Sequence, residues 1–340
     1  IPDISLSLDD ISGIVRLMRE VMLFTAAIEL AGTALLSIRF IPQFGIAEGL
    51  WKAFFHAVSA FCNAGFDLMG QREAFANLSD YAQDPLVNLV IIALIVMGGL
   101  GFLVWHDLRA NRKWNRLSVH TRLVLIMTAL LLIGGTLAIF VLEYSNPQTL
   151  GNMPVGNRVL ASLFQATTCR TAGFNTIDQG ALCSGTAVIS ILLMFVGGSS
   201  GSTAGGIKTT SVAVLILAAW SVLRSRRDIT VFHRRIEERL VLQAVALVMA
   251  ALGLILMGNF ILYTADNVSV ERALYETVSA FSTTGLSENL TPTLGVVSKC
   301  WLILEMYLGR IGILTLGAAV FTRRIFEPKI RYPESKVIVG

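Results

Sequence analysis

Charged residues are scarce in this sequence. Only 15% of its 340 residues are Asp, Glu, Lys or Arg, whereas 54% are hydrophobic and the mean hydropathy is +0.68. Soluble domains carry about 25% charged residues. The net charge of +4 comes from basic residues clustered between hydrophobic runs, so it favours a topological role over nucleic-acid binding. This composition predicts an all-α integral membrane protein and excludes an ordinary soluble domain.

The sequence also lacks the motifs of metal centres, disulfide frameworks and intramembrane enzymes. Its cysteines show no CxxC or CxxH spacing, its four histidines are scattered, and neither HExxH nor paired intramembrane Asp occurs. We therefore expect no enzyme activity. No signal peptide is present, and because the chain begins at Ile1 we expect that part of the protein precedes it. The cysteines are Cys62, Cys169, Cys183 and Cys300.

One glycine-containing turn occurs three times. The segments SAFCNAGF, TTCRTAGFNT and SAFSTTGLS each follow a short apolar run, about half as long as a membrane span. Aligned on Gly65, Gly173 and Gly285, the copies lie 108 and 112 residues apart. A long, regular period with hydrophobic flanks predicts an internal repeat.

Each copy lies within a larger unit, which reads as a span, a half-length helix, a polar turn and a second span. The units predicted are 1–110, 111–235 and 236–322, followed by a basic tail at 323–340. Their spans and half-helices are expected at 15–41, 50–61 and 86–105; at 123–142, 159–164 and an interrupted 186–223; and at 240–263, 270–281 and 300–321.

Basic residues separate the units. Five Lys or Arg lie within 109–122, six within 224–239 and four within 323–331. Cytoplasmic loops are enriched in Lys and Arg. We therefore expect a multi-pass plasma-membrane protein with these loops and the tail in the cytoplasm, and with the half-length helices entering from outside.

Non-helical backbone at membrane depth is tolerated where it is buried or lines a water-filled path. Rings of backbone carbonyls can replace the hydration shell of a potassium ion, and glycine adopts the backbone conformations that such turns require. A single copy would read as a capped helix end, but three copies in the same topological position favour an ion-selectivity filter. Its predicted residues are Asn63, Ala64, Gly65 and Phe66; Thr171, Ala172, Gly173 and Phe174; and Thr283, Thr284, Gly285 and Leu286.

The three segments resemble the pore loops of the Trk/Ktr/HKT superfamily of potassium transporters, most of all those of Ktr membrane subunits, and the resemblance covers essentially the whole chain. It implies four units around one pore, with three visible here and a first unit preceding Ile1. It implies potassium uptake with sodium dependence, a homodimer in the lipid membrane, and a cytoplasmic ring of RCK subunits that alone would bind nucleotide. The alternatives are a sodium-permeable or Na⁺/K⁺ co-transporting member, or a non-conducting structural subunit.

A glycine-rich segment interrupts the last span of the second unit. Its five glycines, with Ser and Thr, are not expected to hold a helix. Gly201 and Gly206 have the spacing of a phosphate-binding loop, but Ile207 stands where that motif needs Lys, so nucleotide binding here is not expected. The resemblance implies a flexible gate below the filter. A helix-packing seam of small residues is the alternative.

Ionisable residues inside the spans are costly and call for a partner or a cavity. The resemblance implies that Arg310 is an electrostatic barrier in the pathway, and a salt bridge to Glu305 is the alternative. Glu29 is expected to have a structural partner in preference to a pore role. The predicted gate comprises Gly197, Gly198, Ser199, Ser200, Gly201, Ser202, Thr203, Ala204, Gly205, Gly206, Lys208 and Arg310.

Overall fold

Helices make up most of the computed structural model, which describes residues 11–70, 75–226 and 228–312. A two-stranded antiparallel hairpin, β1 (Thr230–Val231) with β2 (Arg234–Arg235), is a small exception to the all-helical prediction and lies in the second basic loop. The helices are α1 (Ile11–Phe44), α2 (Ile46–Phe61), α3 (Pro85–Leu100), α4 (Phe102–Ala110), α5 (Val119–Glu143), α6 (Val155–Thr168), α7 (Ser184–Phe195), α8 (Thr209–Leu223), α9 (Glu238–Asp266), α10 (Val270–Phe281) and α11 (Val296–Ile311).

Three of the described helices are long and apolar enough to cross a membrane: α1 from Met18, α5 and α9. They have 27, 25 and 29 residues, which at 1.5 Å per residue exceeds the ~30 Å hydrocarbon core of a bilayer. Most of their surface is not buried by the rest of the protein. Large apolar side chains therefore point outward along these helices, as expected where the surroundings are lipid.

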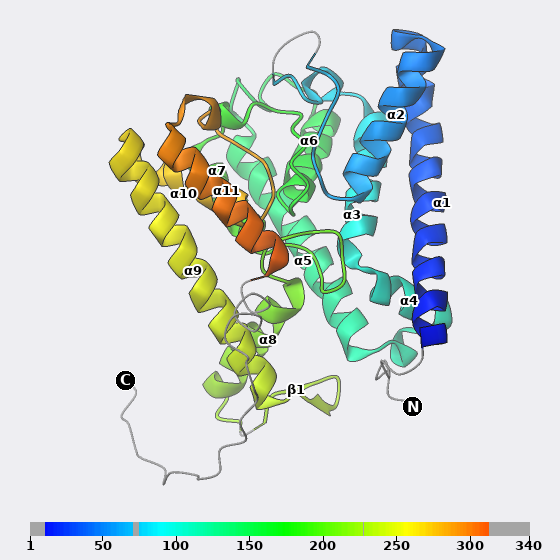
Figure 1. Cartoon of the computed structure of the whole chain (residues 1–340), viewed down its shortest axis with the longest axis vertical. Coiled ribbons are helices and arrows are strands. Elements are labelled where there is room, and N and C mark those ends of the chain that lie inside the picture. The colour runs from blue at the N-terminus through cyan, green and yellow to red at the C-terminus, as the bar shows by residue number, and fades with distance from the viewer. Residues whose placement is uncertain (1–10, 71–74, 227, 313–340) are drawn as a thin grey trace.

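Three short helices, α2, α6 and α10, pack against these long helices. They have 16, 14 and 12 residues, and each follows a long helix in the chain: α2 and α10 begin within four residues of its end, and α6 begins after a loop. Figure 1 shows α2 and α6 starting at the upper end of the molecule and running toward its middle. Buried Phe61, Phe164 and Phe174 belong to one apolar cluster that joins α2 and α6. The predicted half-length helices are thus present: α2 and α6 have longer bounds than predicted, and α10 has the predicted bounds.

The span expected at 86–105 is not one continuous helix. It ends at Leu100, and α4 departs at 89° from α3. Gly101 lies at the break with φ +90°, and a Cβ there would lie 2.8 Å from the Ser199 Oγ and 2.9 Å from the Ser200 carbonyl oxygen. Only glycine fits both the backbone angle and the space. Hydropathy misses this break because the residues on both sides of it are apolar.

The second helix of the second unit is interrupted as well. Residues 196–208, here named the Gly-rich loop, separate α7 from α8. Helix α11 ends at Ile311, where Gly312 has φ +89°. The rest of the span expected at 300–321, and the basic tail, lie outside the described residues. The two basic loops lie at one end of the molecule, with α4, α8 and β1, opposite the end at which the short helices begin (Figure 1).

Candidate ion-conduction site

The three repeated turns share one backbone conformation. Each has a non-glycine residue with positive φ two positions before its glycine: Asn63 (51°), Thr171 (64°) and Thr283 (54°). The glycines themselves have φ of +73°, +82° and +87°. Positive φ is uncommon outside glycine, so its recurrence at one position three times is a structural repeat. We call residues 63–66, 171–174 and 283–286 the first, second and third turns.

The backbone of each turn is tied back to its own short helix. In the first turn the Ala64 N–H donates to the Ser59 carbonyl at 2.9 Å, and in the third the Thr284 N–H donates to the Ser279 carbonyl at 2.9 Å. The N–H and C=O of one planar peptide point in opposite directions. The carbonyls of Asn63 and Thr283 therefore point away from the helix ends.

The turns also meet one another. A Cβ added to Gly65 would lie 2.3 Å from the carbonyl oxygen of Ala172, and one added to Gly173 would lie 2.2 Å from that of Thr284. The first turn thus packs against the second, and the second against the third. Residues more than 100 positions apart thus place a backbone carbonyl oxygen of one turn against the glycine of its neighbour, and such oxygens are the ligands that suit a potassium ion.

Two carbonyls of the predicted set already accept hydrogen bonds. The Ser59 Oγ donates to the carbonyl of Phe66 at 2.8 Å, and the Thr168 Oγ1 donates to that of Phe174. These hydroxyls fix the residue after each glycine against its short helix. The sequence reasoning did not single out Ser59 or Thr168, because a hydroxyl within a short helix has many ordinary explanations.

The Gly-rich loop lies against all three turns. The Thr203 Oγ1 donates to the Phe61 carbonyl at 3.0 Å and lies 3.2 Å from the Asn63 Oδ1. A Cβ on Gly197 would lie 3.2 Å from the Thr171 Cγ2, and one on Gly205 would lie 2.1 Å from the Thr283 Oγ1. The loop therefore meets the positive-φ residue of every described turn.

The break in α3 anchors this loop. A helix leaves its last four carbonyls without intrahelical partners, and the Gly-rich loop bonds to those at the end of α3. The Ser199 N–H donates to the Gly99 carbonyl at 3.0 Å, the Ser199 Oγ to the carbonyls of Gly99 and Leu100, and the Phe102 N–H to the Gly201 carbonyl at 3.1 Å. The loop of one unit is thus held by the interrupted helix of its neighbour.

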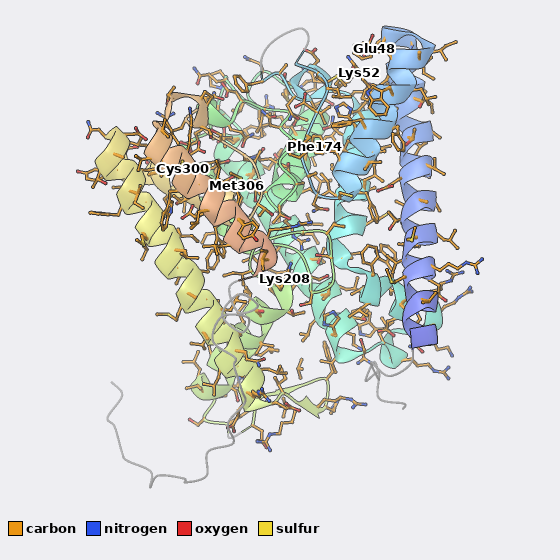
Figure 2. All side chains as sticks on the ribbon, in the orientation of Figure 1. Glu48, Lys52, Phe174, Lys208, Cys300 and Met306 are labelled. Carbon is orange, nitrogen blue, oxygen red and sulfur yellow. The ribbon has the colours of Figure 1, made fainter. Side chains whose placement is uncertain are left out.

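Basic side chains bind carbonyls of the same loop. The Arg310 Nη1 donates to the Thr203 carbonyl, and the Lys208 Nζ donates to the Ala204 carbonyl at 2.7 Å. Arg310 and Lys208 are close enough to repel each other, and Figure 2 shows Lys208 near the lower, C-terminal end of α11. The alternative ion pair is not formed: the buried Glu305 carboxylate accepts from the Trp301 Nε1 at 2.9 Å, and Arg310 has no acidic partner in the described ranges.

A family model described as a cation transport protein, TrkH, matches residues 9–329 of the chain. The chain belongs to the TrkH family of cation transport proteins. It is 41% identical to the Ktr system potassium uptake protein B of Bacillus subtilis, over 97% of this chain and 73% of that protein. It is 36% identical to the potassium/sodium uptake protein NtpJ of Enterococcus hirae, over 99% of this chain and 74% of that one. The family expected from the pore-loop resemblance is confirmed.

The fold agrees with this assignment. The crystal structure of the potassium transporter TrkH from Vibrio parahaemolyticus matches with a TM-score of 0.66 at 19% sequence identity, over 86% of this chain. At that identity the match shows the helical membrane fold alone. This TrkH-family chain spans 62% of the length of that transporter.

The loops that follow the second and third turns are bonded to each other. The Asn289 Nδ2 donates to the Asp178 Oδ1 at 3.0 Å, and the Arg272 Nε lies 3.7 Å from the Glu288 Oε2. Burial raises the pKa of the Glu288 carboxyl, and the nearby Arg272 opposes that rise. Asp178 therefore has a structural role here, since its carboxylate also accepts from the Gly180 N–H.

Glu29 faces the first turn from α1. Its Oε1 lies 4.0 Å from the Sγ of Cys62, the residue directly before that turn. The structural role expected for Glu29 stays a prediction. Across the described part of the TrkH-family chain, no cluster of three or more His, Cys, Asp and Glu could hold a metal ion.

Proposed function

We propose that the chain forms the greater part of a potassium pathway and takes up potassium across the plasma membrane. Three turns with the same positive-φ pattern, packed so that a carbonyl oxygen of one turn lies against the glycine of its neighbour, carry the proposal. Potassium passes through the ring of carbonyl oxygens, which replace its water shell. Relatives named as potassium uptake proteins support the choice of cation.

A fourth turn closes the ring in this proposal. Gly65 faces the second turn and Gly173 faces the third, whereas a Cβ on Gly285 would meet no described atom within 4 Å. We place the fourth turn between the third and the first, supplied by a further span–helix–turn–span unit outside the 340 residues. The greater length of the relatives is compatible with such a unit.

The Gly-rich loop acts as the gate. It lies against each turn, so an ion leaving the carbonyl ring toward the cytoplasm meets the loop unless the loop moves. Arg310 and Lys208 add an electrostatic barrier, because a positive charge repels an approaching cation by about 4 kcal/mol at ~4 Å and an effective dielectric constant of about 20. Opening requires the loop to release its bonds to the end of α3 and to Arg310.

The cytoplasmic end is the surface for regulation. The basic loops gather there, with α4, α8 and β1, and the positive-inside rule assigns this end to the cytoplasm. A ring of nucleotide-binding RCK subunits docks on it, and the membrane subunit forms a homodimer within the lipid. Sodium dependence is included because one relative is named a potassium/sodium uptake protein.

The test is cation uptake by the full-length protein in proteoliposomes. We expect rubidium, as a potassium tracer, to enter, with unlabelled potassium competing far better than sodium; protein-free liposomes are the control. Equal competition by sodium would support the sodium-permeable alternative. A protein that stays silent with its cytoplasmic partner added would contradict conduction and support a structural subunit.

A further inference from the structure

Besides Arg310 and Lys208, a third basic side chain contacts the Gly-rich loop. It belongs to Arg170, which lies just after the end of α6. Arg170 directly precedes the second turn, at the position that Cys62 and Ser282 occupy before the other two turns. Its side chain is buried, with 5% of the residue exposed. The unit that carries the Gly-rich loop is therefore also the unit with an arginine at this position.

The contacts of Arg170 join three parts of the site. Its Nη2 donates to the carbonyl of Gly197, at the start of the loop, at 3.4 Å. Its own carbonyl accepts from the Nδ2 of Asn63, in the first turn, at 3.3 Å. One residue thus connects the first turn, the second turn and the beginning of the loop.

The surroundings of this guanidinium are unusual for a buried charge. No acidic side chain forms an ion pair with Arg170 in the part of the chain described here. The cavity next to it, lined by Asn63, Thr167 and Gly198 among others, has about 10 Å³, which is room for about one water and for no counter-ion. Burying an unpaired charge is costly, so the carbonyl of Gly197 is an important partner for it.

We propose that Arg170 is a positioning residue that couples the filter to the gate. This role rests on the proposed function above. Arg170 holds the Gly197 end of the Gly-rich loop in its closed position, while Arg310 holds the loop farther along, at Thr203. A shift of the second turn moves Arg170 and weakens its bond to the loop. Ion occupancy of the filter and opening of the gate are thereby linked through one side chain.

The experiment compares resting rubidium uptake of the full-length protein and its Arg170→Gln variant in proteoliposomes. We expect resting uptake to rise about tenfold, the effect of losing one charged hydrogen bond that holds the loop closed. The matched control is Arg158→Gln. Arg158 lies on the same helix α6 and also donates to backbone carbonyls, those of Met153 and Gly151, but at the outer end. We expect its resting uptake to match that of the unmodified protein.

A second comparison separates coupling from a general structural effect. In a background whose Gly-rich loop lacks residues 199–204, Arg170→Gln should raise resting uptake no further. The part of the loop that the Arg170 hydrogen bond keeps closed is already absent in that background. An equal tenfold rise in that background, or no rise in the intact protein, would overturn the proposal. If Arg170→Gln does not fold, Arg170→Lys serves in its place, with a smaller rise expected and an unchanged rate refuting the idea. An unmodified protein without rubidium uptake would instead overturn the proposed function itself.

Discussion

Replacing Gly173 with Ala should damage the proposed filter, because the new side chain would clash with the third turn. The residue has φ +82°, and its new Cβ would lie 2.2 Å from the Thr284 carbonyl oxygen. Ordinary van der Waals contact begins at 3.4 Å. Either the Thr284 carbonyl moves by about 1.2 Å or the second turn refolds, and in both cases a proposed potassium ligand is displaced.

The expected magnitude follows from two terms. A left-handed conformation costs a residue with a Cβ about 1–2 kcal/mol, and every 1.4 kcal/mol is a factor of about ten. The displaced carbonyl adds a further loss, since a shift of about 1 Å at a site of defined geometry can cost about 100-fold. We therefore expect rubidium uptake to fall at least about tenfold and the preference for rubidium over sodium to decrease with it.

The assay is rubidium uptake into proteoliposomes, with and without competing sodium. Gly134→Ala is the matched control: Gly134 lies within α5, and a Cβ there would meet nothing within 4 Å. That variant should transport normally and gain up to about 1 kcal/mol in stability, because alanine is the better helix former. If Gly173→Ala keeps both the rate and the preference within twofold of the unmodified protein, the assignment of this glycine to the filter is wrong.

Three other substitutions test the contacts around the filter and gate by the same uptake assay. Arg310→Ala removes the guanidinium from the Thr203 carbonyl and should raise resting uptake; an unchanged rate would argue against a barrier. Ser199→Ala removes a donor to the end of α3, worth about 1 kcal/mol, and should raise resting uptake about fivefold. Ser59→Ala frees the Phe66 carbonyl and should lower the rubidium-over-sodium preference without opening the gate; selectivity equal to that of the unmodified protein would contradict a supporting role for this hydroxyl.

The fold could be predicted in outline because its signals are local. Long apolar runs mark α1, α5 and α9, and the spacing of Gly65, Gly173 and Gly285 reveals the repeat. The break at Gly101 could not be predicted in this way. Glycine is required there because Ser199 and Ser200, from another unit, lie against the position that a Cβ would take. Hydropathy averages over a window and does not record such a contact.

The same distinction applies to the candidate site: local sequence identifies some of its residues, and only the packing of the helices identifies the others. The sequence alone was enough to identify the turns and the Gly-rich loop as the residues of interest, since a polar, glycine-containing stretch within an apolar span needs a reason. The roles of Ser59, Thr168 and Arg170 emerge only once α2, α6 and the loop are packed together. Their partners are backbone carbonyls, which every residue possesses, so residue identity does not signal the pairing.

The sequence by itself determined that the protein is a helical membrane protein of repeated units with three filter-like turns, because hydropathy, charge and period are properties of the chain taken in order. Only the tertiary structure decided which turn packs against which, and that the loop of the second unit is held by the broken α3 of the first. These contacts join residues about 100 positions apart, and their geometry depends on how whole helices pack.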